Sequence, residues 1–238
     1  MTVEVLEDGG AATARAATFI AGRIRGSRDA VIGLPTGRTM VPVYDRLVVE
    51  PIDWSGIRTF NVDEFAGTAP DHAGSFRAFM DRHLFSRVPL APAVIGFPRG
   101  DTGDLEAECA RYEAAVTAAG GLDLLVLGIG ANGHVGFNEP GETLHAATHV
   151  AALSEATRRA NAELFGGEWR RVPSQALTIG MGHVLRAREI LVVATGASKA
   201  QAVRAMVRGP LTTRCPASWL QVHGRATVVL DAAAAGAL

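Results

Sequence analysis

Short apolar runs alternate with longer amphipathic segments along this chain, and this rhythm limits the folds it can adopt. Most of the runs carry Val, Ile and Leu at consecutive positions, which is typical of strands buried on both faces. The runs cover residues 30–34, 57–62, 93–97, 122–127, 149–153, 189–195 and 226–231. Segments with helical character cover residues 10–25, 40–49, 75–85, 104–119, 154–165 and 198–208. Such alternation predicts βαβ units in an α/β fold with a mostly parallel sheet.

The chain gives no sign of a division into domains. It has no internal repeat, no charge block and no long Pro/Gly-rich linker, so we expect residues 1–238 to form one domain.

Two predicted helices begin with residues that favour a helix start. Asp104 precedes an acidic first turn and Ser154 precedes Glu155, and both residue types favour the N-cap position.

Composition excludes several classes of function. With 23 Lys and Arg against 24 Asp and Glu, the net charge is −1, so we expect no nucleic-acid partner. No apolar stretch is long enough to span a membrane, and the acidic first ten residues do not resemble a signal peptide. Cys109 and Cys215 lack metal-ligand spacing and predict two reduced thiols. We therefore expect a cytoplasmic protein, either a monomer or a homo-oligomer.

Two glycine-bearing loops that follow predicted strands are candidate anion sites. In an open parallel sheet, ligands bind beyond the carboxyl ends of the strands. The loop at residues 33–39 offers backbone N–H groups at the start of a helix. Thr36 and Thr39 add hydroxyl donors, Arg38 adds positive charge, and Gly37 belongs to the turn. It lacks the Gly-Lys-Ser/Thr ending of a Walker A loop. Lys199 lies in the first helical turn after another strand, where an anionic ligand would explain a positive charge.

Two further loops carry candidates for acid–base chemistry. Asp63 and Glu64 follow the second strand, and neighbouring carboxylates in a cleft can raise one pKa toward neutrality. The loop at residues 128–141 places His134 and Glu139 in a glycine-rich setting, a plausible acid–base pair. This loop also contains a literal GxGxxG. A dinucleotide fingerprint requires a helix to open there, and the sequence that follows has no helical period.

Taken together, these loops resemble the glucosamine-6-phosphate deaminase (isomerase) family. The resemblance covers nearly the whole chain, and GFNEPG separates the deaminases from the related 6-phosphogluconolactonases. The matching segments are GLPTGRT, TFNVDEF, LLVLGIGANGHVGFNEPG, ATRRANAELF, VPSQALTIGMG, TGASKAQA and PASWLQVHGRATVVLD. The resemblance implies a Rossmann-like three-layer sandwich that converts an amino-sugar 6-phosphate to the ketose phosphate plus ammonia, without metal or organic cofactor.

The resemblance also implies roles for individual residues. Asp63 would move a proton between C2 and C1 of the sugar, and Glu64 would support its loop. His134 would assist ring opening, oriented by Glu139 and accompanied by Asn132, at a position where some members have aspartate. The phosphate-binding set would comprise Thr36, Gly37, Arg38, Thr39, Gly130 and Lys199.

This chain departs from the family pattern at Glu163, where members usually carry an arginine that contacts the substrate phosphate. Our hypothesis is that the basic partner has moved to Arg38, a position at which many members have a small residue. His149 and Ala151 stand where allosteric members carry basic residues, so we expect no such activation.

Three alternatives stay open at this stage. They are a galactosamine-6-phosphate isomerase/deaminase, a 6-phosphogluconolactonase, and a sugar-phosphate-sensing module of a transcriptional regulator. The sensor would need a DNA-binding module and would often lack the residues that correspond to Asp63 and His134.

Overall fold

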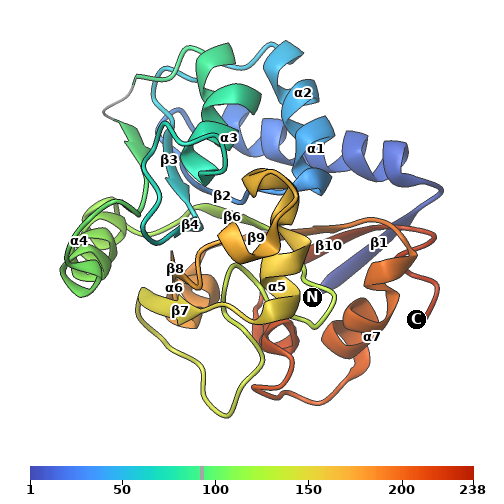
Figure 1. Ribbon diagram of the computed structural model, residues 1–238. Helices are drawn as coiled ribbons and strands as arrows, with labels where there is room; N and C mark the ends of the chain where they lie inside the picture. Colours follow the sequence, from blue (N-terminus) through green and yellow to red (C-terminus); the bar gives the residue numbers. More distant parts are fainter. Residues whose placement is uncertain (92–93) are drawn as a thin grey trace.

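The computed structural model describes residues 1–91 and 94–238 and shows strands and helices in alternation (Figure 1). The strands are β1 (Thr2–Leu6), β2 (Val31–Leu34), β3 (Arg58–Asn61), β4 (Asp63–Phe65), β5 (Ile95–Gly96), β6 (Leu124–Leu127), β7 (His149–Ala152), β8 (Gln175–Thr178), β9 (Ile190–Ala194) and β10 (Ala226–Asp231). The α-helices are α1 (Gly9–Arg25), α2 (Val41–Val49), α3 (Phe76–His83), α4 (Leu105–Ala118), α5 (Glu155–Ala160), α6 (Met181–Arg186) and α7 (Ala200–Arg208). Ala93, where the third predicted strand begins, lies outside the described residues.

Seven strands form the central sheet in the order β1-β10-β9-β6-β2-β3-β5, and every neighbouring pair is parallel. The middle strands β2, β6 and β9 are buried at every residue. This is the setting that their continuous apolar sequences predict. The predicted α/β fold with a mostly parallel sheet is therefore confirmed. The edge strand β1 was not predicted, because its sequence TVEVL alternates polar and apolar residues.

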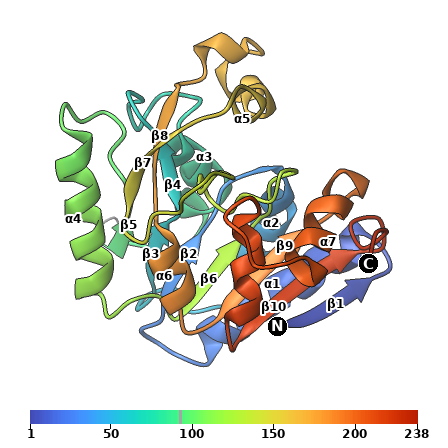
Figure 2. The ribbon, with the colours of Figure 1, turned by 90° about the horizontal axis from the view of Figure 1, so that it is seen from below.

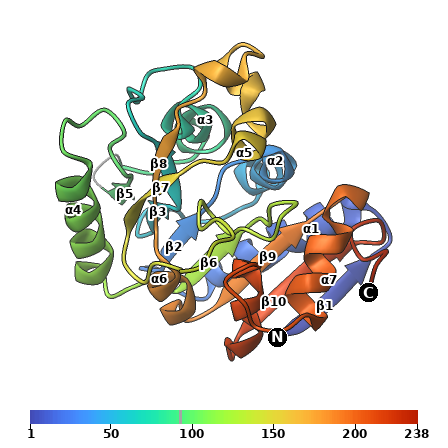
Figure 3. The ribbon, with the colours of Figure 1, turned by 60° about the horizontal axis from the view of Figure 1, so that its bottom comes forward.

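Successive residues of the central strands point to opposite faces of the sheet, and each face packs against its own helices. One core contains Ile32, Leu34, Leu124, Val126, Leu191 and Val193 together with buried residues of α1, α2 and α3. The other contains Val31, Leu125, Leu127, Ile190, Val192 and Val228 together with buried residues of α4, α6 and α7. Figure 3 shows α7 in front of the sheet and α1 behind it. Helices on both faces complete the expected three layers.

A second, three-stranded sheet in the order β4-β8-β7 is antiparallel throughout. The sequence did not predict it. The run at residues 149–153 supplies β7 to this small sheet and not to the parallel one. Only Val62 separates β3 in the large sheet from β4 in the small one, so the chain changes sheet at this point. Figure 2 shows the small sheet between α4 and α3. A cluster of Phe65, Phe76, Phe137 and Phe165 packs beneath it.

The order of strands places a topological switch point between β2 and β6. From β2 the chain builds outward through β3 to β5, and it then crosses to the other side of β2 to form β6, β9 and β10. Loops that follow neighbouring strands diverge at such a point and leave a crevice at the carboxyl edge. The four candidate loops follow β9, β6, β2 and β3, which are consecutive neighbours. The fold therefore gathers at one edge the loops that the sequence singled out.

Helix starts follow the predicted caps. The Asp104 carboxylate accepts a hydrogen bond from the Ala107 N–H at 2.9 Å, and the Ser154 hydroxyl accepts one from the Thr157 N–H at 3.2 Å. The helix predicted over residues 154–165 breaks at Asn161, where a 3-10 helix, η4 (Ala162–Phe165), replaces α5. Within the described residues, no helix combines the length and the apolar character that a membrane span needs.

Substitution by alanine should have opposite effects on stability at two glycines with different surroundings. Gly33 lies in β2, and a Cβ there would be 2.6 Å from Leu125 Cδ1, whereas a Cβ on Gly22 in α1 would meet nothing within 4 Å. We expect Gly33→Ala to lower the free energy of unfolding by about 1–3 kcal/mol through overpacking. Gly22→Ala should raise it by about 0.5–1 kcal/mol through helix propensity. Urea unfolding measures both, and equal signs would contradict this account of the core.

Candidate active site

Two loops at the carboxyl edge share one design. Gly37 (φ +114°) follows β2 and Gly196 (φ +89°) follows β9, and both lie in the region that favours glycine. Each turns the chain directly into a short 3-10 helix, Arg38–Met40 and Ala197–Lys199 respectively. The Met40 N–H donates to the Gly37 carbonyl at 2.9 Å and the Lys199 N–H to the Gly196 carbonyl at 3.0 Å. The strand-to-helix turns predicted at both loops are therefore present.

The mouth of the site carries three charged side chains. Arg38 Nη1 lies 3.3 Å from Glu163 Oε2, and the two side chains are 84% and 80% exposed. Lys199 is half-buried, and desolvation together with the charge of Arg38 lowers its pKa. Glu163 lies on η4, the 3-10 helix that follows α5. Glu163, which stands where family members usually carry an arginine, thus pairs with Arg38. That Arg38 binds the phosphate in place of this arginine stays a prediction.

Asp63 begins β4, at the point where the chain leaves the large sheet. It is 6% exposed, and burial, followed by the charge of Glu64, raises the pKa of its carboxyl well above the usual range. A Cβ built on Gly136 would lie 3.7 Å from Asp63 Oδ2, so the carboxyl borders the loop that carries His134. The structure therefore brings Asp63 to the crevice beside the β6 loop.

Glu64 points away from Asp63, because adjacent residues of a strand face opposite sides. Its carboxylate accepts hydrogen bonds from the N–H groups of Phe65 at 2.8 Å, Phe76 at 2.9 Å and Arg77 at 2.9 Å. The last two are the first N–H groups of α3, so Glu64 ties β4 to this helix. Burial raises the pKa of Glu64 to about 7 despite these donors. The two carboxylates therefore have separate hydrogen-bond partners, although the charge of Glu64 contributes to the raised pKa of Asp63.

The loop after β6 folds tightly around His134. The Gly130 N–H donates to the His134 carbonyl at 2.9 Å. A Cβ on Gly130 would lie 2.3 Å from the imidazole ring, so only glycine lets the ring pack against this backbone. Gly133 (φ +88°) packs in the same way against Cys215 Sγ. Within the GxGxxG pattern, Gly130 therefore makes room for the imidazole and Gly133 for Cys215, and no helix opens after this loop.

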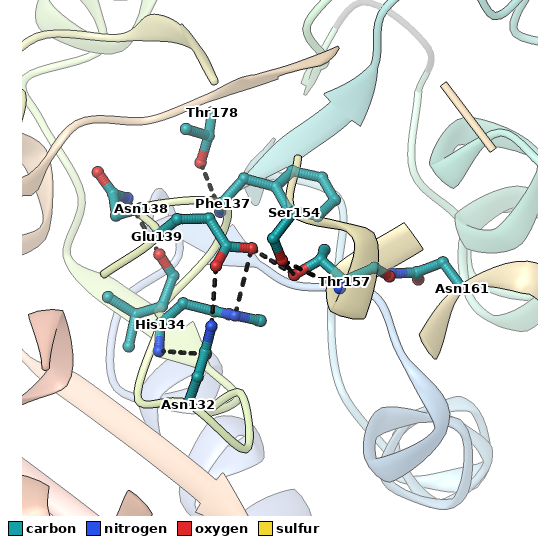
Figure 4. Close-up of polar contacts among 10 residues, drawn as sticks. Asn132, His134, Phe137, Asn138, Glu139, Ser154, Thr157, Asn161 and Thr178 are labelled. Carbon is teal, nitrogen blue, oxygen red and sulfur yellow. Dashed lines mark hydrogen bonds and ion pairs between the residues drawn. The ribbon is translucent and has the colours of Figure 1, made fainter. Parts of the chain in front are cut away.

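His134, Glu139 and Asn132 form one polar network (Figure 4). Asn132 Nδ2 donates to Glu139 Oε2 at 2.9 Å, and the His134 N–H donates to Asn132 Oδ1 at 3.2 Å. His134 Nδ1 faces Glu139 Oε1 at 3.6 Å, beyond hydrogen-bond distance. Burial lowers the pKa of His134, Glu139 acts in the opposite direction, and Lys199 lowers it further. The arrangement can keep a neutral imidazole at the crevice beside a carboxylate.

Four side chains that the sequence did not single out support these loops. The Tyr44 hydroxyl donates to the Pro35 carbonyl, and the Tyr112 hydroxyl donates to the Asn61 carbonyl. Asp231 accepts from the Gly196 N–H at 3.0 Å, and Thr157 donates to Glu139. Asp231 could have been found, because it is a carboxylate at the end of an apolar run. The others depend on packing between segments distant in sequence.

The described part of the chain contains no group of three His, Cys, Asp or Glu side chains arranged to hold a metal ion. At the carboxyl edge of the sheet, the structure gathers a buried carboxyl from β4, an imidazole with a carboxylate from the β6 loop, and two cations from the β2 and β9 loops. These groups are suited to moving protons on a ligand that carries an anionic end.

The α/β fold, with acid–base groups and cations at the carboxyl edge of its sheet, is consistent with an enzyme that acts on an anionic substrate, and the sequence comparison gives the family. Residues 8–229 match the family described as glucosamine-6-phosphate isomerases/6-phosphogluconolactonase, and the chain belongs to this family.

Within this family, the chain is similar to glucosamine-6-phosphate deaminases. Glucosamine-6-phosphate deaminase 2 of Bacillus subtilis (strain 168) is 44% identical over 224 residues, covering 92% of this chain and 90% of the relative. Glucosamine-6-phosphate deaminase of Arthrobacter sp. (strain FB24) is 43% identical over 242 residues, covering 100% and 93%. A solved structure of a monomeric glucosamine-6-phosphate deaminase superposes with a TM-score of 0.96 at 38% identity, covering 100% of both chains.

The surroundings of Glu64 predict a pH-dependent stability. A carboxyl whose pKa rises from 4.5 to about 7 on folding binds more protons in the folded state, so its contribution to stability falls as pH rises through this interval. Glu64→Gln has no group that titrates at this position. We therefore expect the free energy of unfolding of wild type to fall relative to that of Glu64→Gln by at most about 3 kcal/mol from pH 4.5 to 7.5. Urea unfolding at several pH values measures it. A difference that stays constant with pH would contradict the prediction.

Proposed function

We propose that this protein converts an amino-sugar phosphate, in the first instance glucosamine 6-phosphate, to the ketose phosphate and releases ammonia. The observation that carries the proposal is the convergence of Asp63, His134 with Glu139, and Arg38 with Lys199 at one edge of the sheet. Aldose–ketose isomerisation needs these three elements: a base near C1 and C2, an acid–base group at the ring oxygen, and an anchor for the phosphate. Identity above 40% to deaminases supports the same activity.

Phosphate binding is assigned to the β2 and β9 loops. Thr36, Gly37 and Thr39 offer hydroxyl and backbone donors at the start of a helix, where the dipole favours an anion. Arg38 and Lys199 add positive charge, and Gly130 borders the same crevice from the β6 loop. Because the chain is nearly neutral overall, these local groups must supply the attraction. Anchoring the phosphate holds the sugar ring in a fixed position relative to the catalytic side chains.

Ring opening is assigned to His134. Opening the pyranose moves a proton from the C1 hydroxyl to the ring oxygen, and an imidazole can accept it and return it. A base that is neutral at the working pH is required, and burial of His134 favours the neutral form. Glu139 tunes the imidazole through its charge from 3.6 Å away, and Asn132 holds Glu139 through its amide. Glu139 is the one carboxylate of this network.

Proton transfer along the carbon chain is assigned to Asp63. The carboxylate would take the C2 proton and deliver it to C1, while a second proton passes from the C2 amine to the C1 oxygen. This leaves a hydroxyl at C1 and an imine at C2, which water hydrolyses to the ketone with loss of ammonia. Burial raises the pKa of Asp63, which makes it a stronger base than an exposed carboxylate. Glu64 supports this position from the other side of β4 by fixing α3.

The Arg38–Glu163 pair gives the phosphate site a feature of its own. A phosphate that binds Arg38 must compete with the Glu163 carboxylate, so Glu163 weakens phosphate affinity and makes it depend on ionic strength. A carboxylate at this position also leaves room for a different epimer or phosphate position on the substrate. Galactosamine 6-phosphate is therefore the second substrate to examine, and unphosphorylated glucosamine the third.

The main test is ammonia release from glucosamine 6-phosphate, with Asp63→Asn as the paired variant. We expect release by wild type and a fall in kcat of about 10²–10⁴-fold in the variant, the usual contribution of a general base. An enzyme-coupled ammonia assay measures both.

The same assay separates the alternatives. Release from galactosamine 6-phosphate alone would move the proposal to that epimer, and hydrolysis of 6-phosphogluconolactone without ammonia release from any amino sugar would identify a lactonase. Binding of sugar phosphates without turnover would favour a sensing module. Full activity of Asp63→Asn would refute its role as base.

Substitutions at the mouth of the site test the exchange of charge. Arg38→Ala should raise KM for the phosphorylated substrate about tenfold with little change in kcat, since a charge-assisted hydrogen bond is lost. Glu163→Gln should lower KM about two- to fivefold, the range expected for an exposed ion pair, and the gain should disappear at high salt. If neither variant changes KM, the phosphate lies elsewhere.

A further inference from the structure

Thr157 is a buried residue of α5 that none of the site assignments uses. It is 4% exposed, and its hydroxyl donates to Glu139 Oε1. Figure 4 shows this hydroxyl on the far side of the Glu139 carboxylate from Asn132. Helix α5 therefore reaches into the acid–base network of the β6 loop with a single side chain.

The direction of this hydrogen bond is fixed by the helix cap. The Thr157 N–H donates to Ser154 Oγ at 3.2 Å, and the Ser154 hydroxyl in turn donates to Thr157 Oγ1 at 3.0 Å. A hydroxyl has one proton to give. Since Thr157 Oγ1 already accepts from Ser154, its own proton is directed to Glu139, and Glu139 Oε1 must be the acceptor.

Helix α5 is held firmly enough to keep this contact in place. Asn161 Nδ2 donates to the Thr157 carbonyl at 2.9 Å. Arg158 Nε donates to the Val172 carbonyl at 2.9 Å, and Arg158 Nη2 to the Arg170 carbonyl at 3.0 Å. These bonds join α5 to the segment that follows it, so Thr157 is presented from a braced helix and not from a free loop.

The consequence falls on His134. Thr157 supplies a donor to Oε1 and Asn132 supplies one to Oε2, so each oxygen of Glu139 already has a partner. His134 Nδ1 lies 3.6 Å from Oε1, is buried and has no hydrogen-bond partner among the described residues. The two donors fix the position of the carboxylate from opposite sides, and in this position Oε1 stays outside hydrogen-bond distance of His134 Nδ1.

We propose that Thr157 is a positioning residue that holds the Glu139 carboxylate and keeps it from forming a close hydrogen bond with His134. The proton of His134 is then not locked to Glu139, and the imidazole stays free to exchange a proton at the crevice. The charged groups that face the ring are Glu139 on its own loop and Lys199 from the β9 loop. The catalytic role of this arrangement rests on the proposed function, whereas the positioning of the Glu139 carboxylate by Thr157 does not.

The decisive variant is Thr157→Val, which keeps the shape of the side chain and removes the donor. Glu139 Oε1 then has His134 Nδ1 as its nearest donor, and the pair should close to hydrogen-bond distance. We expect the titration midpoint of His134, followed by NMR of the imidazole nitrogens in the free protein, to rise by about one pH unit. Thr157→Ser restores the hydroxyl and should return the midpoint to the wild-type value.

Kinetics give the second readout. In Thr157→Val, kcat for ammonia release should fall about tenfold while KM changes less than about twofold, because the phosphate contacts are untouched. An acyclic amino-alditol 6-phosphate needs no ring opening and should bind wild type and variant equally. Thr157→Ser should recover most of the lost kcat.

Thr148→Val is the matched control. Thr148 is also buried, and its hydroxyl donates at 2.8 Å to Glu113, whose carboxylate lies 2.8 Å from His183 Nε2. The same chemical change at a Thr–Glu–His cluster outside the site should leave kcat and the His134 midpoint unchanged. Should Thr157→Val fail to fold, Thr157→Ala removes the same donor without adding bulk.

The outcomes are separable. An unchanged His134 midpoint in Thr157→Val or Thr157→Ala overturns the proposal, whatever reaction the protein catalyses. A wild type that releases no ammonia refutes the proposed function, and the NMR titration still decides the role of Thr157. Loss of kcat in both Thr157→Val and Thr157→Ser, with no shift of the midpoint, would show a merely structural role and contradict the positioning role.

Discussion

Parallel pairing across a sheet buried on both faces is the constraint on which the rest of this molecule depends. All seven strands of the large sheet run the same way, so their carboxyl ends share one edge. The chain starts outward from β2 in one direction and resumes at β6 in the other, which separates the loops after these two strands. The phosphate-binding candidates follow β2 and β9, and the acid–base candidates follow β3 and β6. A different strand order with the same local sequences would scatter these groups.

The small antiparallel sheet adds what the large one lacks. The chain leaves β3 after Asn61 and enters β4 at Asp63. Asp63 therefore belongs to a strand, and the pairing of β4 with β8 fixes the direction of its side chain. Asp63 faces the crevice while Glu64, one residue later, faces α3. Burial raises the pKa of both carboxyls, yet one is bordered by Gly136 of the His134 loop and the other caps a helix. The same packing places β7 and α5 beside the β6 loop, which brings Thr157 to Glu139.

Charge is distributed to match this division. The His134 and Glu139 side chains are mostly buried, at 22% and 16% exposed, whereas Arg38 and Glu163 lie at the surface and are screened by solvent and salt. The match to the family covers residues 8–229 and therefore includes both groups of side chains. Under the proposed function, this nearly neutral protein would present a local anion site whose affinity is reduced by one neighbouring carboxylate. Substrate preference within the family would then be adjusted at the surface without disturbing the buried acid–base groups.

The sequence by itself determined the α/β class, the central strands and the loops that carry Asp63, His134, Glu139, Arg38 and Lys199. These follow from local patterns: apolar runs, glycine after a strand and polar residues at strand ends. It could not determine that residues 149–153 pair antiparallel in a second sheet, because a short apolar run fits either sheet. Nor could it place Glu64 on α3, Thr157 on Glu139 or Glu163 on Arg38, which lie 12, 18 and 125 residues apart along the chain. Those contacts carry no periodic signal, and only the packing of distant segments decides which polar groups meet.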